Sequence, residues 1–138
     1  MQQFQINYIS VVISAVAMMV LGFLWYGPLF GKQWMKLVGM TKADLDAAKK
    51  KGMTKQYAIM ALSALVLSYG FDHVLLAFNT TTISMALQGA FWTWLSFIAT
   101  VLLGQVLWLN KSWKLYLLDT GYYLVGLGII GIVLTLWR

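Results

Sequence analysis

The chain has 138 residues, of which 61% are hydrophobic and only 10% are charged. Soluble domains are about half apolar and about a quarter charged, so this chain carries more apolar surface than one small core can hide, and a bilayer is the expected solvent. The sequence contains no cysteine, which excludes disulfides and sulfur-ligated metals. The formal net charge of +6 comes from lysines between apolar runs, so it indicates membrane topology rather than a nucleic-acid partner.

Four apolar stretches are each close to the roughly 20 residues that a membrane-spanning helix needs. They cover about residues 7–26, 57–78, 83–109 and 115–137. The connections after the second and third stretches are only a few residues long, which forces antiparallel neighbours. We therefore expect a single all-α membrane domain over residues 1–138, with four transmembrane helices in an antiparallel bundle.

The lysines predict the orientation of this bundle. The long connection of about residues 29–55 holds seven lysines, and the connection before the fourth span adds Lys111 and Lys114. The connection between the second and third spans holds none, and the N-terminal segment has no charged side chain. The positive-inside rule therefore places these two lysine-bearing connections in the cytoplasm and both termini outside it, with Arg138 as the only basic residue on the outer side.

The run WYGPLFGKQW interrupts the first apolar stretch. Gly27 and Pro28 are expected to end the first helix, because proline disfavours a helical residue before it and cannot donate to the preceding turn. The residues that follow are amphipathic, with apolar side chains on one helical face and lysines on the other. We predict an interfacial elbow in which a short helix lies on the membrane surface, and the alternative is a disordered exit loop. The elbow residues are Trp25, Tyr26, Pro28, Phe30, Lys32 and Trp34, with Leu37 and Val38 on the apolar face.

A short soluble helix is expected in TKADLDAAKKKG. Thr41 is a suitable N-cap with Asp44 three residues later, and Gly52 suits the C-terminal end. We interpret the whole connection as a solvated linker that sets topology, and a partner-binding site is the alternative.

Small and weakly polar residues recur at helical spacing in three spans. Membrane helices associate through such residues, so we expect them to pack inside the bundle, and the alternative is a narrow polar path. The first span carries Asn7, Ser10, Ser14 and Ala17, the second carries Ala61, Ala64, Ser68 and Asp72, and the third carries Gly89, Thr93, Ser96, Thr100 and Gly104.

The fourth span has two faces that are unsuited to lipid. One face carries Gly121, Gly128 and Thr135, and the opposite face carries Asp119, Tyr122, Tyr123 and Gly126. One face can pack in the chain's own bundle and the other against a second subunit. The expected partners are therefore the lipid bilayer and either a second copy of the chain or a larger membrane complex.

Five residues form the candidate intramembrane polar site: Asp72, His73, Asn7, Asp119 and Tyr123. Asp72 lies about two turns from the outer end of the second span, where it is either functional or simply protonated or bonded to Asn7 or a hydroxyl. Asp119 lies about one turn inside the opposite end, where Lys111, Lys114 or Tyr123 is its expected partner. The two carboxylates are at opposite depths, so they cannot form a catalytic pair but could mark the two ends of a path.

Enzyme chemistry is poorly supported, because one histidine and no cysteine leave few nucleophiles or metal ligands. No catalytic residue, metal or cofactor is expected. Three functions stay open: a structural, accessory or self-assembling membrane component, a small homo-oligomeric channel or carrier that uses Asp72, and an interfacial lipid-binding or lipid-modifying enzyme. A water-filled cavity at Asp72 would favour transport, a dry core would favour assembly, and a headgroup held by Lys111 and Lys114 would favour the third.

Four segments, GFLWYGPLFGKQWMKLVGM, KKKGM, GAFWTWLSF and NKSWKLYLLDTGYYLVGLGIIG, resemble a family of small bacterial membrane proteins classed as a domain of unknown function. The most specific part is WYGPLFGKQW. The resemblance implies four membrane helices in a bacterial cytoplasmic membrane, and it implies no activity, cofactor or catalytic residue.

Overall fold

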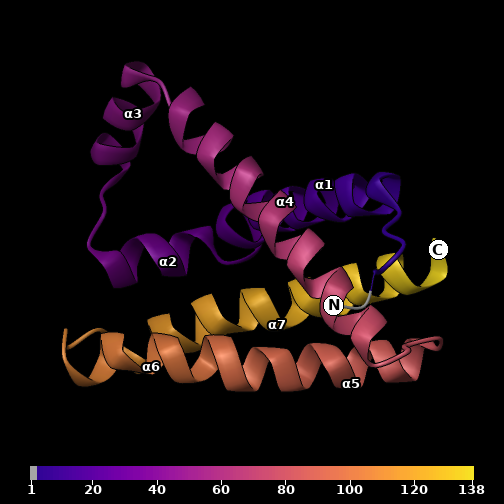
Figure 1. The fold of residues 1–138 in the computed structure, drawn as a ribbon. Helices are drawn as coiled ribbons and strands as arrows, with labels where there is room; N and C mark the ends of the chain where they lie inside the picture. Colours follow the sequence, from indigo (N-terminus) through magenta and orange to yellow (C-terminus); the bar gives the residue numbers. More distant parts are fainter. Residues whose placement is uncertain (1–2) are drawn as a thin grey trace.

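The computed structural model describes residues 3–138, and within that range it consists of helices and short connections without a strand (Figure 1). Four helical segments are long and apolar enough to cross a membrane: Tyr8–Leu29, Thr54–Ala77, Ile83–Leu107 and Trp113–Leu136. The predicted all-α membrane bundle is therefore confirmed, with each span within a few residues of its expected bounds.

Two π-helical turns, η1 and η2, interrupt the first and third spans. The elements in chain order are α1 (Tyr8–Leu24), η1 (Trp25–Leu29), α2 (Gly31–Val38), α3 (Lys42–Lys51), α4 (Thr54–Ala77), α5 (Ile83–Trp94), η2 (Leu95–Ala99), α6 (Thr100–Leu107) and α7 (Trp113–Leu136).

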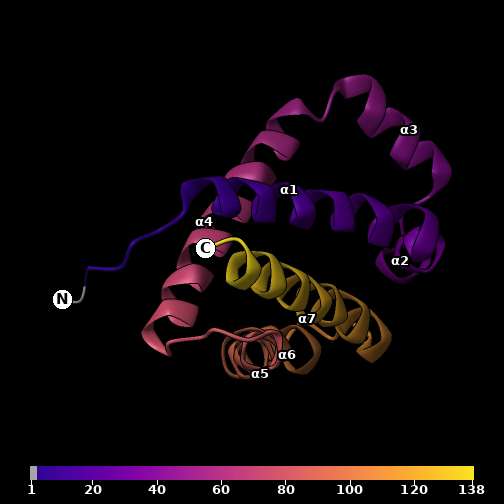
Figure 2. The same ribbon diagram turned by 90° about the vertical axis from the view of Figure 1, so that its right-hand side faces the viewer.

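The helix α7 lies in the middle of the bundle, between α1 on one side and α5 and α6 on the other (Figure 2). The helix α4 packs mainly on α1 and meets α5 only slightly, so the second and third spans are joined mainly through α1 and α7. In Figure 1 the connection before α4 and the connection before α7 lie at the left, and the α4–α5 connection lies at the right. We call the left side the lysine-rich end and the right side the opposite end.

The core lies where α1 and α4 meet α7. Gly126 lets α1 and α7 approach closely, because a Cβ atom built there would overlap the Met18 sulfur. The buried apolar residues of this core are Val11, Ala15, Met18, Ala64, Phe71, Leu75, Ala90, Tyr122, Leu127, Ile130 and Leu134.

The first span does not end at Gly27 and Pro28 as predicted. Instead, the chain widens into the π-helical turn η1, closed by a hydrogen bond of 2.8 Å from the Phe30 amide to the Trp25 carbonyl. The turn contains Pro28, which the wider ring accommodates without breaking the helix. The backbone leaves helical geometry at Phe30, and Figure 2 shows α2 nearly along its axis while α1 runs across the view, so the bend follows the proline rather than preceding it.

The short helix α2 has the predicted amphipathic pattern. Lys32 and Lys36 are exposed, whereas Trp34 and Leu37 are partly buried. Val38, which was expected on the apolar face, is exposed. The aromatic rings fold back on the end of the first span: the Phe30 ring lies 4.7 Å from that of Trp25, and the Trp34 ring lies 5.8 Å from that of Tyr26, measured between ring centroids. The position of α2 on the membrane surface stays a prediction.

The soluble helix predicted in the linker is α3. Thr41 caps it and forms a reciprocal capping box with Asp44, as the spacing indicated. The hydrogen bond from the Thr41 backbone amide holds the pKa of Asp44 below its ordinary value. Gly52 ends the helix with a positive φ of 90°, which favours glycine.

We predict that Gly31→Ala destabilises the bend and that Gly27→Ala does not. A Cβ atom at Gly31 would lie 2.7 Å from the Tyr26 carbonyl oxygen, a backbone atom that cannot move alone, whereas nothing lies within 4 Å of one at Gly27. Overpacking of this kind costs about 1–3 kcal/mol, so the midpoint of thermal unfolding in detergent should fall by several degrees for Gly31→Ala only. Equal midpoints for the two variants would contradict this account of the bend.

Candidate functional site

Asp72 forms an ion pair at the opposite end of the bundle. Its side chain is almost fully buried, and the Arg138 guanidinium donates to Oδ1 at 3.1 Å. The same guanidinium donates to the Thr80 carbonyl at 3.1 Å. Arg138 therefore joins the segment after α7 to α4 and to the α4–α5 connection, and it supplies the cation that a buried carboxylate needs.

Asn7 and His73 do not contact Asp72 through hydrogen bonds. The Asn7 amide caps α1 and donates to the Trp137 carbonyl at 2.7 Å, so it ties the start of α1 to the end of α7. His73 shares a hydrogen bond of 2.8 Å with the Tyr69 carbonyl and packs against the rings of Phe4 and Tyr69. The predicted polar site is therefore divided among separate local roles.

Buried hydroxyls continue inward from Asp72. Ser14 and Ser68 are fully buried in α1 and α4, so the small-residue faces predicted there do turn into the protein. The hydroxyls of Ser14, Ser68 and Thr135 have no hydrogen-bond partner among residues 3–138. Further inward, the Met18 side chain fills the space above Gly126, and this apolar packing separates the polar group around Asp72 from the lysine-rich end.

Asp119 lies near the lysine-rich end and accepts a hydrogen bond of 2.8 Å from the Tyr26 hydroxyl. The predicted partners Lys111, Lys114 and Tyr123 form no hydrogen bond or ion pair with Asp119. Sequence reasoning placed Tyr26 in the elbow and Asp119 in a separate site. The structure joins the two, and the only sequence signal was that both lie about one turn from the same membrane surface.

Aromatic donors fasten α7 to its neighbours beside this carboxylate. The Trp25 indole donates to the Leu118 carbonyl at 3.1 Å, and the Trp94 indole donates to the Thr120 carbonyl at 2.7 Å. Together with the Tyr26 bond to Asp119, three consecutive residues of α7 thus accept from side chains of the first and third spans. Buried indole and phenol groups need such partners in a medium without water, so the predicted aromatic anchor of the elbow is also a tertiary clamp.

The small-residue stripe predicted for the third span is not its buried face. The structure buries Ala86, Ala90 and Ala99, whereas Ser96 and Thr100 are exposed. The predicted spacing assumed a continuous α-helix, but η2 inserts one extra residue and rotates the later positions by about 100°. Of the remaining stripe residues, Gly89 faces the Leu75 side chain, Thr93 is partly buried, and Gly104 faces the Trp108 ring of its own segment.

Both polar or small faces of α7 are covered within one chain. A Cβ atom at Gly121 would lie 3.4 Å from the Trp25 ring, and one at Gly128 would lie 3.6 Å from the Leu87 side chain. The opposite face, with Gly126, packs on Met18 of α1. The two faces of α7 therefore give no reason for a second subunit, and any such reason must lie elsewhere on the surface.

The fold and these contacts define a multi-pass α-helical membrane protein whose polar groups are satisfied mainly around its last helix. A family model described as "Protein of unknown function (DUF1761)" matches residues 9–135, which include most of all four spans, so the chain belongs to this family. The family resemblance drawn from the sequence is confirmed. No curated protein and no solved structure matches the chain.

We predict that Arg138→Gln destabilises the fold more than the double variant Asp72→Asn/Arg138→Gln. The single change leaves a buried carboxylate without a cation, whereas the double change replaces the ion pair by two neutral polar groups. The side chain of Arg138 is 27% exposed, so we expect a loss of about 2–3 kcal/mol rather than the larger values of fully buried pairs. Unfolding in mixed detergent micelles measures both variants, and a double variant at least as unstable as the single one would refute the pairing argument.

Proposed function

We propose that this protein is a self-assembling membrane component that associates with a second copy of itself through the outer face of its third span. The observation that carries the proposal is the poor burial of this span. In its most apolar 18-residue window only 11% of residues are buried, against 39% in the fourth span. A surface that meets only lipid would be purely apolar, whereas the exposed face of this span also carries polar side chains.

Five residues define this face, which we call the α5 stripe: Ser84, Gln88, Trp92, Ser96 and Thr100, all of them exposed. In an uninterrupted α-helix, positions 84 and 100 would differ by about 160° around the axis. The extra residue in η2 reduces this difference to about 60°, so the turn brings the residues onto one side. The Thr100 hydroxyl also donates to the Ser96 carbonyl at 2.7 Å within the turn.

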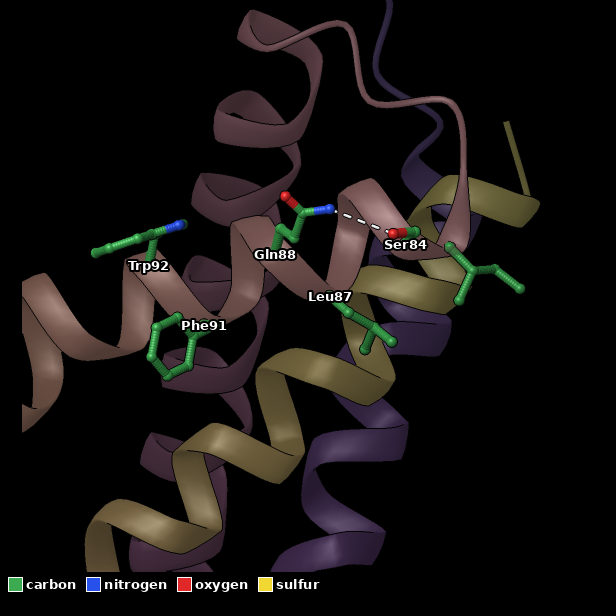
Figure 3. A pocket seen from close by; sticks show the side chains of 6 residues that line it. Ser84, Leu87, Gln88, Phe91 and Trp92 are labelled. Carbon is green, nitrogen blue, oxygen red and sulfur yellow. Dashed lines mark hydrogen bonds between the residues drawn. The ribbon is translucent and has the colours of Figure 1, made fainter.

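Gln88 gives this face a reason to meet its own copy. It lies in a shallow groove of about 510 Å³ with Ser84, Leu87 and Trp92 (Figure 3), and its amide nitrogen donates to the Ser84 hydroxyl at 3.2 Å. An amide is both donor and acceptor, so two such groups related by a two-fold axis satisfy each other without any further residue. The span carries no charge between positions 83 and 107, which suits a neutral partner of the same kind.

The other two functions have weaker support. A channel or carrier needs a path from Asp72, yet Arg138 occupies that carboxylate and Met18 packs tightly against α7 further inward. An enzyme at the membrane surface needs a nucleophile that is hydrogen-bonded to a base. The two possible bases have other partners: Asp119 accepts a hydrogen bond from the Tyr26 phenol, and His73 is hydrogen-bonded to the Tyr69 backbone carbonyl.

Cross-linking tests the interface, because the natural chain has no cysteine. We expect Ser84→Cys to form disulfide-linked dimers in oxidised membranes, whereas Val12→Cys, which is also exposed and also lies near the opposite end but on α1, does not. Equal cross-linking at the two positions, or none at Ser84→Cys, would contradict the proposal. Adding Gln88→Leu should weaken the dimer roughly 10–1,000-fold, because it removes both hydrogen bonds of the reciprocal amide pair.

We also infer the orientation in which both termini are extracytoplasmic and the lysine-rich end faces the cytoplasm of a bacterium. Nine lysines at that end support it. A reporter that is active only outside the cytoplasm should be active when fused to either terminus and inactive when inserted after Gly52. Activity of the inserted reporter alone would reverse the topology.

A further inference from the structure

The two intramembrane carboxylates, Asp72 and Asp119, have partners of different charge. Asp72 has the Arg138 guanidinium at 3.1 Å, which is the ion pair that the structure records in residues 3–138. Asp119 has only the Tyr26 phenol as a side-chain partner among residues 3–138, although it lies five residues beyond Lys114 along α7 and is partly buried. A carboxylate at such a depth is normally paired with a cation or marks a functional site. Asp119 is therefore partly exposed, and among residues 3–138 no cation is paired with it.

Several aromatic rings pack together near this carboxylate. Tyr26 donates to it, and Tyr123 lies one turn further along α7 on the same face. Both rings pack edge-on against Tyr122, with centroids 5.5 Å and 5.0 Å from its own. The Trp34 ring of α2 packs edge-on against Tyr26, with ring centroids 5.8 Å apart. The π-faces and phenol oxygens of such rings attract a cation, and they do so more strongly where water is excluded.

We infer that Asp119, Tyr26 and Tyr123 bind an ammonium group at the lysine-rich end of the bundle. The second carboxylate oxygen of Asp119 and the phenol oxygens of Tyr26 and Tyr123 accept hydrogen bonds from the N–H groups of the ammonium, and the aromatic rings lie beside its positive charge. This site requires no contact between copies, so it does not depend on the proposed assembly through the α5 stripe.

The lysines at this end favour a ligand in which the ammonium group is covalently linked to an anionic group. Lys32 and Lys36 are exposed on α2, Lys111 is exposed in the connection before α7, and Lys114 is exposed in the first turn of α7. These lysines repel a small free cation but attract a phosphate, so a zwitterionic ethanolamine phospholipid headgroup fits the arrangement better than a simple amine. Both sources share the same ammonium chemistry, and the experiment separates them.

The test uses the full chain in detergent micelles and follows its thermal unfolding midpoint. One arm adds phosphatidylethanolamine, with its N-acetylated form of equal chain length as the control that lacks the ammonium. The other arm adds soluble ethanolamine or phosphoethanolamine. Each is repeated with Asp119→Asn, which still accepts from Tyr26, and with Asp46→Asn, which removes one carboxylate from the exposed helix α3 at the same end.

We expect phosphatidylethanolamine, and not its N-acetylated form, to raise the midpoint of the natural chain and of Asp46→Asn by roughly 2–5 °C. Asp119→Asn should lose this rise. A rise with the soluble amines that also depends on Asp119 would support the site and assign it to a free ligand. A rise that Asp119→Asn retains, or no rise with any ammonium compound, would overturn the inference.

Discussion

The last helix or the two residues after it take part in every side-chain hydrogen bond that joins one span to another within residues 3–138. These bonds reach α7 or the two residues after it from Asn7, Trp25, Tyr26, Asp72, Thr80, Trp94, Met18 and Ala99. Lipid offers no hydrogen bonds and little hydrophobic force between helices, so such contacts and close packing hold the spans together. The central place of α7 follows from this constraint, and so does the peripheral place of the third span.

Local chemistry made much of this fold predictable. Hydropathy indicates the four spans because a helix that crosses a bilayer must be long and apolar. The capping box of α3 depends only on two residues three positions apart. The partners of Asp72 and Asp119 were not predictable in this way. Arg138 lies 66 residues from Asp72, and Tyr26 lies 93 residues from Asp119, so each pair depends on how α7 sits against other spans.

The π-helical turns explain most of the remaining differences. Pro28 signals an irregularity in the first span, but it does not say whether the helix ends or widens. The sequence LSFIA of η2 contains neither proline nor glycine, so nothing in it signals a wider turn. A pattern based on 3.6 residues per turn therefore assigns the later residues to the wrong face. Such turns often occur at functional positions. Here one carries the aromatic clamp onto α7, and the other aligns the α5 stripe.

The tight packing of Met18 over Gly126 divides the molecule into two polar regions. At the opposite end the charge is internally balanced, since Arg138 meets Asp72. At the lysine-rich end the balance is left open, since Asp119 meets only a phenol while exposed lysines surround the same end. A departure from full internal pairing is more informative than pairing itself, because natural sequences break local rules mainly where function requires it. Both ends thus fasten the bundle, but they differ in kind: among residues 3–138 the carboxylate at the opposite end is paired with a cation, and the one at the lysine-rich end is not.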